Sequence, residues 1–137
     1  TEAGIPVMGH LGLTPQSINQ FGSYRVRGTS EEEQQQILDD AHALAQAGAF
    51  AIVLEKIPLS LAQKVSQAID VPTIGIGAGN HCDGQILVYT DMLGMTIDFS
   101  PRFVRKYDNL HERMHNAVTQ YCNDVRDIAF PSTEESY

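Results

Sequence analysis

Short apolar runs alternate along the chain with segments of helical periodicity. The apolar runs occupy residues 5–9, 49–54, 71–76 and 85–89. The second of them reads AFAIVL without interruption by polar residues, which is typical of a strand buried on both faces of a parallel sheet. We therefore expect four strands, the first of which ends in a loop that begins at His10.

Three further segments, at about 31–47, 59–69 and 110–128, repeat their apolar residues at the spacing of one helix face. Ser30 precedes the first of them and Glu33 follows three residues later, which predicts a capping box. The alternation of strands and helices predicts parallel β/α units in an α/β fold. The pattern fits an open doubly wound sheet and half of a (β/α)8 barrel equally well.

Composition excludes several classes of protein. The chain has 137 residues, enough for one domain, and its net charge is −8 with nine Lys and Arg against 17 acidic residues. No basic stripe is present for nucleic-acid binding, and no apolar run approaches the roughly 20 residues that span a bilayer. Cys82 and Cys122 form no CxxC pair, so neither a disulfide framework nor a zinc site is expected. We expect a cytoplasmic protein.

Glu55 is the first candidate for chemistry, because it directly follows the apolar run Ala51–Leu54. Active sites of both candidate architectures lie where the carboxyl ends of the strands meet. A half-desolvated carboxylate at that edge is a candidate general base. The structural alternative is a glutamate that pairs with a nearby lysine or caps the next helix, and spacing alone leaves both open.

His10 is the second candidate. An imidazole after the first strand can donate a hydrogen bond to a substrate oxygen or bind a metal. A single histidine in a loop is more often satisfied by the backbone, and spacing alone favours that alternative. His111 and His115 lie four residues apart but lack the glutamate of an HExxH zinc motif, so we interpret them as surface residues.

The segment 75–80 (GIGAGN) is rich in glycine but matches neither GxGxxG nor a Walker loop. A strand rather than a long helix is expected after it, so dinucleotide binding is disfavoured. These glycines let the backbone turn or pass close to a ligand. The other polar residues expected after strands are Asn80, Asp83 and Asp91.

Taken together and in order, three stretches resemble the ketopantoate hydroxymethyltransferase family. They are PVMGHLGLTPQSINQFGSYRVRG (6–28), AIVLEKIP (51–58) and VPTIGIGAGNHCDGQILVYTDMLGM (71–95). The resemblance continues through PRFVRKY (101–107) and covers nearly the whole chain. Its members are (β/α)8 barrels, commonly assembled as decamers, that move a hydroxymethyl group from 5,10-methylenetetrahydrofolate to 3-methyl-2-oxobutanoate and give 2-dehydropantoate.

The resemblance implies roles for two residues. Glu55, in the VLExxP motif, is expected to remove the C3 proton of the 2-oxo acid, and His10, in the GHLGLTPQ motif, is expected to hydrogen-bond the bound 2-oxo acid. A divalent metal, commonly Mg²⁺, chelates that acid in the family. Nothing in this chain matches the family's metal-binding segments, so no metal ligand is expected among its residues. The folate-binding residues are not assigned, and Lys56 departs from the uncharged residue that relatives often carry there.

Residues 1–137 are therefore expected to form the C-terminal half of a single (β/α)8 barrel domain, with about the last four β/α units. The chain opens without an initiator methionine, which favours a piece of a longer protein. The expected partners are the 2-oxo acid, folate, further copies of the chain and the N-terminal half of the barrel, but neither nucleic acid nor membrane. The alternatives are a non-catalytic half barrel and a phosphoenolpyruvate/pyruvate-type barrel with aldolase or lyase activity on a 2-oxo acid.

Overall fold

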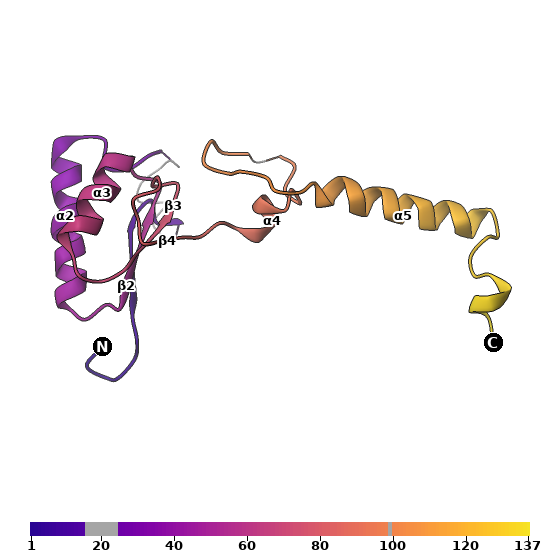
Figure 1. Ribbon diagram of the computed structural model, residues 1–137, viewed down its shortest axis with the longest axis horizontal. Coiled ribbons are helices and arrows are strands. Elements are labelled where there is room, and N and C mark those ends of the chain that lie inside the picture. The colour runs from indigo at the N-terminus through magenta and orange to yellow at the C-terminus, as the bar shows by residue number, and fades with distance from the viewer. Residues whose placement is uncertain (16–24, 99) are drawn as a thin grey trace. The chain divides into compact units, whose positions relative to one another are not determined.

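A parallel sheet of four strands organises the first of two units in this chain (Figure 1). The structure is a computed structural model that describes residues 1–15, 25–98 and 100–137. The first unit covers Thr1–Ile86 and the second covers Leu87–Tyr137. The last residues of the GHLGLTPQS motif lie outside the described residues.

The strands lie in the sheet in the order in which they occur along the chain. They are β1 (Met8–Gly12), β2 (Ala51–Glu55), β3 (Thr73–Ile76) and β4 (Gly84–Gln85). Every neighbouring pair is parallel. The prediction of an α/β fold with a parallel sheet is confirmed.

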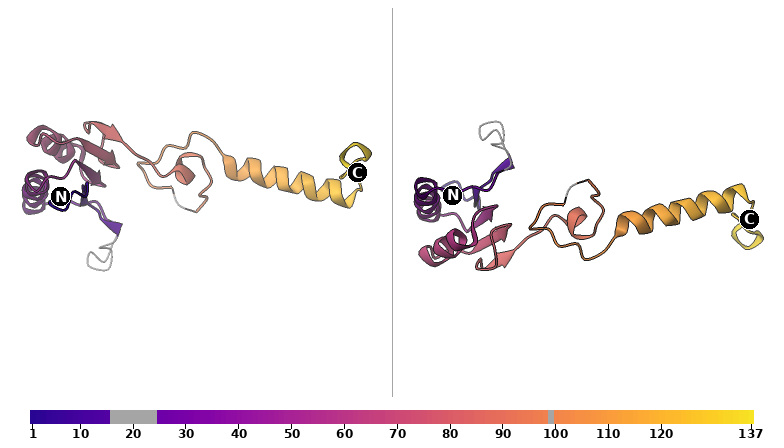
Figure 2. Two further views of the ribbon diagram at one scale, coloured as in Figure 1. Left: turned by 90° about the horizontal axis from the view of Figure 1, so that it is seen from below. Right: turned by 90° about the horizontal axis from the view of Figure 1, so that it is seen from above.

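Two helices cover one face of this sheet. They are α2 (Glu31–Gln46) and α3 (Leu59–Ala68), and they lie side by side on the same side of the strands (Figure 2). The largest fully buried apolar side chains between helices and sheet are those of Ile52, Leu54, Leu61 and Val65. Each contributes about 1.5–3 kcal/mol by leaving water, so this layer holds the unit together.

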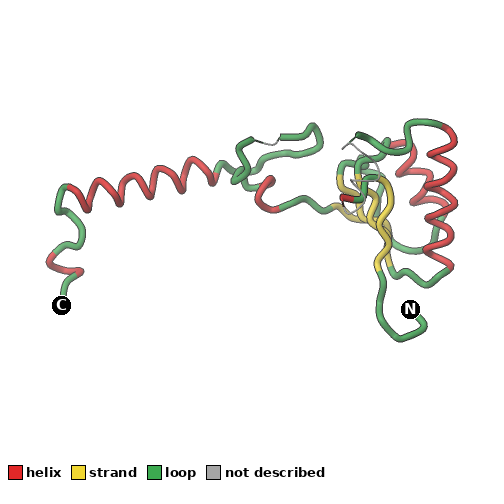
Figure 3. Tube along the Cα trace, turned by 180° about the vertical axis from the view of Figure 1, so that it is seen from behind, coloured by secondary structure: helices red, strands yellow, loops and turns green. Residues whose placement is uncertain are grey.

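The opposite face of the sheet has no helix over it among the described residues of this unit (Figure 3). Side chains alternate along a strand. Because Ile52 and Leu54 face the helices, Val53 and Glu55 point the other way. The parallel register places the rest of this face on the neighbouring strands, at Met8, His10, Ile74 and Ile76. On this face Ala51 is buried and Val53 and Glu55 are partly buried, so the prediction that the strands are buried on both faces is met only in part in the described residues of this unit.

Two strand predictions need correction. β1 begins at Met8 and runs through His10 to Gly12, so His10 lies within the strand and not in a following loop. The limits of β1 are set by its pairing with β2, in which Met8 lies opposite Ala51 and Gly12 lies opposite Glu55. The residue pattern within one strand does not show which residues that strand pairs with. β4 has only two residues. After it, the N–H of Ile86 donates one more hydrogen bond to β3, at the carbonyl of Gly75, and the pairing ends there.

The start of α2 confirms half of the predicted capping box. The Ser30 hydroxyl accepts the Glu33 N–H at 3.2 Å. The Glu33 carboxylate reaches past Ser30 and accepts the N–H groups of Gly28 at 2.6 Å and Thr29 at 3.2 Å. These hydrogen bonds hold residues 28 and 29, which precede the helix, against its first turn.

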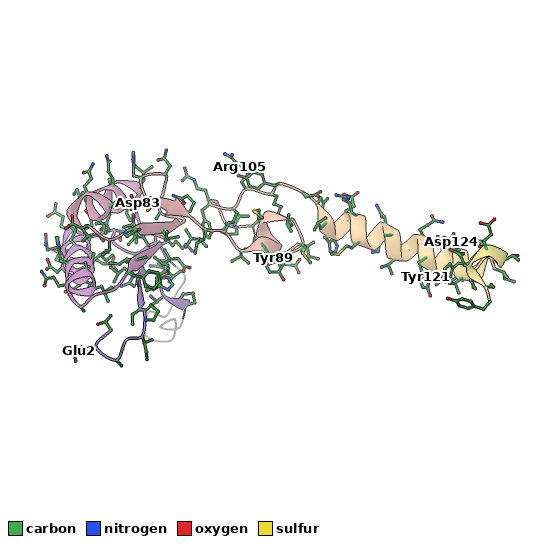
Figure 4. All side chains as sticks on the ribbon, turned by 60° about the horizontal axis from the view of Figure 1, so that its bottom comes forward. Glu2, Asp83, Tyr89, Arg105, Tyr121 and Asp124 are labelled. Atoms are coloured by element: carbon green, nitrogen blue, oxygen red, sulfur yellow. The ribbon has the colours of Figure 1, made fainter. Side chains whose placement is uncertain are left out.

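The second unit contains α4 (Tyr89–Met92), α5 (Leu110–Arg126) and a short 3₁₀ helix, Thr133–Glu135. The predicted C-terminal helix is confirmed, but no residue of α5 is buried. Four apolar side chains of α5 are 45–61% exposed, those of Met114, Val118, Tyr121 and Val125. Tyr121 is labelled in Figure 4, where it projects from the helix. Among the described residues, no helix is long and apolar enough to cross a membrane.

Candidate functional site

The carboxyl end of the sheet brings His10 and Glu55 into contact. Nε2 of His10 lies 3.0 Å from Oε2 of Glu55. The two side chains come from neighbouring strands and from the face that α2 and α3 leave open. They are 30% and 18% exposed, respectively, so both are shielded from bulk water but reachable. A neutral imidazole protonated at Nε2 donates to the carboxylate in this geometry.

This pair is what the sequence prediction missed. The sequence singled out both residues but treated them separately, one as a base and one as a substrate ligand. The signal that joins them is the parallel register, in which Gly12 lies opposite Glu55 and His10 lies opposite Val53. Since His10 and Glu55 stand two register positions apart on the same face, a long imidazole spans the gap.

Gly12 brings the backbone of β1 close to Glu55. Its φ is +89°, and a Cβ added there would lie 2.2 Å from the carbonyl oxygen of Glu55. The following residue, Leu13, donates its N–H to that same oxygen at 2.8 Å. Only glycine can occupy this position, because a side chain would collide with the Glu55 carbonyl. The close packing of β1 and the Leu13 hydrogen bond together hold the end of β2 that carries Glu55.

Asp83 lies at the other end of the sheet, which corrects the prediction that it belongs to the site. Its carboxylate accepts the N–H of Thr73, the first residue of β3, at 2.8 Å and the Thr73 hydroxyl at 3.0 Å (labelled in Figure 4). The Thr73 hydroxyl also lies 2.6 Å from the Ser66 hydroxyl of α3. This chain of bonds joins α3, β3 and the segment before β4, so its role is structural.

The same cluster shifts two pKa values in opposite directions. The hydrogen bonds from the Thr73 backbone and hydroxyl lower the pKa of the Asp83 carboxyl, because they stabilise its charged form. Burial raises the pKa of the Cys82 thiol, since desolvation disfavours the thiolate. Both cysteines are free in this structure.

The remaining candidates lie apart from the pair. Asn80 is exposed in the segment after β3. Asp91 is a buried residue of α4 in the second unit, and not a residue that follows a strand, which corrects its predicted placement. The strand expected before it stops at Gln85.

A cavity of about 270 Å³ runs along the outer edge of β1. One wall is β1 with the residues after it, and the other is α2 with Arg27. Its lining includes His10 but not Glu55; the remaining lining residues are Leu11, Gly12, Thr14, Arg27, Glu33, Gln36, Ile37 and Asp40. β1 is an edge strand of the sheet, and the cavity borders it.

The residues of the site do not by themselves fit a divalent metal. Mg²⁺ prefers six oxygen ligands in octahedral geometry and is usually held by one or two carboxylates with waters and substrate oxygens. Within 1–15, 25–98 and 100–137, no three His, Cys, Asp or Glu residues gather where they could hold an ion. The single carboxylate of the pair is engaged with His10.

Comparison with known proteins decides the family. The model of the ketopantoate hydroxymethyltransferase family matches residues 1–133. The chain belongs to this family. Proteins described as 3-methyl-2-oxobutanoate hydroxymethyltransferase from Chlorobaculum tepidum and Chlorobium phaeobacteroides are 59% and 58% identical to it over all 137 residues. One from Phocaeicola vulgatus is 57% identical over 135 residues.

The chain spans about half the length of the curated relatives it matches, 50% in each of these three. The resemblance noted in the GHLGLTPQ and VLExxP segments is thereby confirmed at the level of the family. His10 and Glu55 both lie within the matched residues. The contact between them therefore lies within the part of the chain that the family model matches.

Proposed function

We propose that this chain supplies the proton-transfer half of a 3-methyl-2-oxobutanoate hydroxymethyltransferase. The complete protein moves a hydroxymethyl group from 5,10-methylenetetrahydrofolate to 3-methyl-2-oxobutanoate and gives 2-dehydropantoate and tetrahydrofolate. The observation that carries the proposal is the 3.0 Å contact between His10 and Glu55. It lies at the carboxyl end of a parallel sheet, in a chain of this family.

Glu55 acts as the base in this proposal. Its carboxylate takes the proton from C3 of the 2-oxo acid, and the electrons of the broken C–H bond form the enolate. The enolate carbon then forms a bond to the methylene carbon of the folate as one of the two C–N bonds of that carbon breaks. Water attacks the same carbon, its oxygen becomes the hydroxyl of the product, and the second C–N bond breaks. The two nitrogens of the released tetrahydrofolate take up one proton from Glu55 and one from the water. A carboxylate positioned within hydrogen-bond reach contributes typically about 10²–10⁴-fold to such a step.

His10 has two ring nitrogens, and the structure uses one of them. Nε2 lies against Glu55, so it orients the carboxylate and favours one tautomer of the imidazole. With its proton on Nε2, the neutral ring has no proton on Nδ1. The predicted hydrogen bond from His10 to the bound acid therefore comes either from Nε2–H, after Glu55 has taken the C3 proton, or from Nδ1–H in the other tautomer, whose Nε2 then accepts from the protonated Glu55. Both arrangements keep His10 and Glu55 in one proton-transfer unit.

A Mg²⁺ ion remains a prediction for the complete protein. Its chemistry there is the chelation of the 2-oxo acid and the stabilisation of the enolate's charge. The ligands would come from the part of the family protein that this chain does not span, since the described residues do not fit the ion. The folate-binding residues are expected there and at the rim of the sheet.

We also propose that residues 1–137 are the C-terminal half of a single (β/α)8 barrel. Sequential order of parallel strands, without a reversal, is the order found in such a barrel, whereas doubly wound sheets contain a switch point. The sheet has two open edges, at β1 and β4, and one face with no helix over it. The other half would pair with these edges, fill the cavity beside β1, and complete the oligomer expected for the family.

The experiment follows exchange of the C3 proton of 3-methyl-2-oxobutanoate for deuterium in D₂O by proton NMR, with the complete protein and Mg²⁺ and without folate. Glu55→Gln is expected to lower the exchange rate at least 100-fold, while Glu31→Gln, on the exposed first turn of α2, keeps the wild-type rate. Exchange that persists in Glu55→Gln contradicts the role of Glu55. No exchange in any complete protein would favour a non-catalytic half barrel.

A further inference from the structure

The turn directly after Glu55 has a backbone conformation that residues with a side chain rarely adopt. Lys56 has a φ of +51°, in the left-handed region. Among the described residues, the other non-glycine residue in this region is Ile128, with a φ of +57°. A conformation of this kind persists where the surrounding structure fixes it, and it is concentrated at functional sites.

Hydrogen bonds from three separate segments hold this turn. The N–H of Leu13, after β1, donates to the carbonyl of Glu55 at 2.8 Å. The N–H of Arg27, before α2, donates to the carbonyl of Lys56 at 3.0 Å. The N–H of Lys56 donates to the carbonyl of Ile76, at the end of β3, at 2.9 Å. The turn therefore joins the ends of three strands to the helix that covers them.

The segment that holds Lys56 is itself held by α2. The guanidinium of Arg27 pairs with the Glu33 carboxylate, and the other oxygen of that carboxylate accepts the N–H of Gly28 at 2.6 Å. On the β1 side, the glycine at position 12 leaves no room for a Cβ against Glu55. The contacts on both sides thus fix the direction in which the chain leaves Glu55.

We propose that Lys56 is a positioning residue for Glu55, and that it acts through its backbone conformation. The left-handed turn sends the chain away from β2 immediately after Glu55. The carboxylate is thereby kept at the sheet edge, 3.0 Å from Nε2 of His10. The catalytic consequence rests on the proposed role of Glu55, but the geometric consequence does not.

A matched pair of substitutions separates backbone conformation from side-chain charge. Lys56→Asn and Lys56→Val both remove the charge, but asparagine tolerates the left-handed region and a β-branched residue does not. Lys56→Gly adopts the turn without strain. If conformation positions Glu55, the asparagine and glycine variants keep the His10 contact and the valine variant loses it.

The readout for the contact is the ¹⁵N NMR spectrum of the His10 imidazole in the full chain. Its two nitrogen shifts report which nitrogen carries the proton, and Glu55→Ala supplies the spectrum of a released imidazole. We expect Lys56→Asn and Lys56→Gly to match the wild-type spectrum and Lys56→Val to match Glu55→Ala. If Lys56→Val does not fold, Lys56→Ala takes its place, with a mixture of the two spectra expected.

Deuterium exchange in the complete protein is the second readout. Lys56→Val is expected to slow C3 exchange about 10- to 100-fold, as a displacement of about 1 Å at a reacting group does. Lys56→Asn is expected to keep most of the wild-type exchange rate. Ile128→Gly, which relieves the same conformation in the second unit, keeps the wild-type rate and spectrum.

The two measurements test the positioning of Glu55 and its role as the base separately. A Lys56→Val or Lys56→Ala spectrum identical to wild type overturns the positioning proposal, and so does a Lys56→Asn spectrum that matches Glu55→Ala, because the charge would then be responsible. Spectra that follow the proposal in a protein without C3 exchange support the positioning of Glu55 and contradict its role as the base.

Discussion

Gly12→Ala tests how closely β1 and β2 approach at the site. The new Cβ would lie 2.2 Å from the Glu55 carbonyl oxygen and 2.6 Å from Cγ2 of Ile57. Carbon and oxygen atoms in close contact are normally about 3.3 Å apart, so the two strand ends must separate by about 1 Å. The hydrogen bond from Leu13 to that carbonyl lengthens with them.

The cost of this substitution has two parts. A residue with a Cβ in the left-handed region costs about 1–2 kcal/mol, and forcing atoms into a packed region costs about 1–3 kcal/mol. Gly4→Ala isolates the first part, since Gly4 has a φ of +74° but no atom within 4 Å of the added Cβ. Gly12→Ala is therefore expected to be less stable than Gly4→Ala by about 1–3 kcal/mol.

Urea unfolding of both variants measures this difference, provided that the slope of the transition is unchanged. The same 1 Å displacement is expected to slow C3 exchange up to about 100-fold in Gly12→Ala. Gly4→Ala should leave exchange at the wild-type rate. If the free energies of unfolding of the two variants agree within about 0.5 kcal/mol, the close approach at Gly12 contributes nothing, and the reasoning about Glu55's fixed position is refuted.

Two further predictions concern the cluster at the other end of the sheet. The pKa of Asp83 is lower in the folded chain than its ordinary 3.8, so its bonds to Thr73 stabilise the fold above that value and are lost as the pH falls through the folded pKa. Urea midpoints should thus fall less between pH 7 and pH 3 in Asp83→Asn than in wild type, and an equal fall in both proteins would contradict this argument. Because the pKa of the Cys82 thiol is raised above 9.0, its alkylation by iodoacetamide in Cys122→Ser should rise at higher pH than that of free cysteine, and a coincident pH profile would contradict the burial argument.

Much of the first unit is predictable because its elements are specified locally. The helix at α2 has Ser30 before it and an apolar face in phase with the helix period, and the continuous run before Glu55 identifies β2. The limits of β1 and β4 are set by what each strand pairs with. Pairing between distant segments does not appear in either strand's own pattern, so those limits were predicted wrongly.

The site could be predicted as residues but not as geometry. The strand-end position of Glu55 and the matching motifs identified Glu55 and His10. Their contact depends on the register of β1 against β2, and the turn at Lys56 depends on backbone bonds from Leu13 and Arg27. Asp83 was misplaced because the segment 77–83 returns to the start of β3, which the order of residues along the chain does not reveal.

The most direct test of the central proposal is C3 deuterium exchange by this chain with and without the proposed N-terminal half of the barrel. That half can be made as a separate polypeptide from the part of the Chlorobaculum tepidum relative that the chain does not span. Exchange that requires both polypeptides, and that disappears when Glu55→Gln replaces the wild-type chain, is the predicted result. Exchange that survives in the Glu55→Gln mixture would contradict the assignment of proton transfer to this half of the family fold.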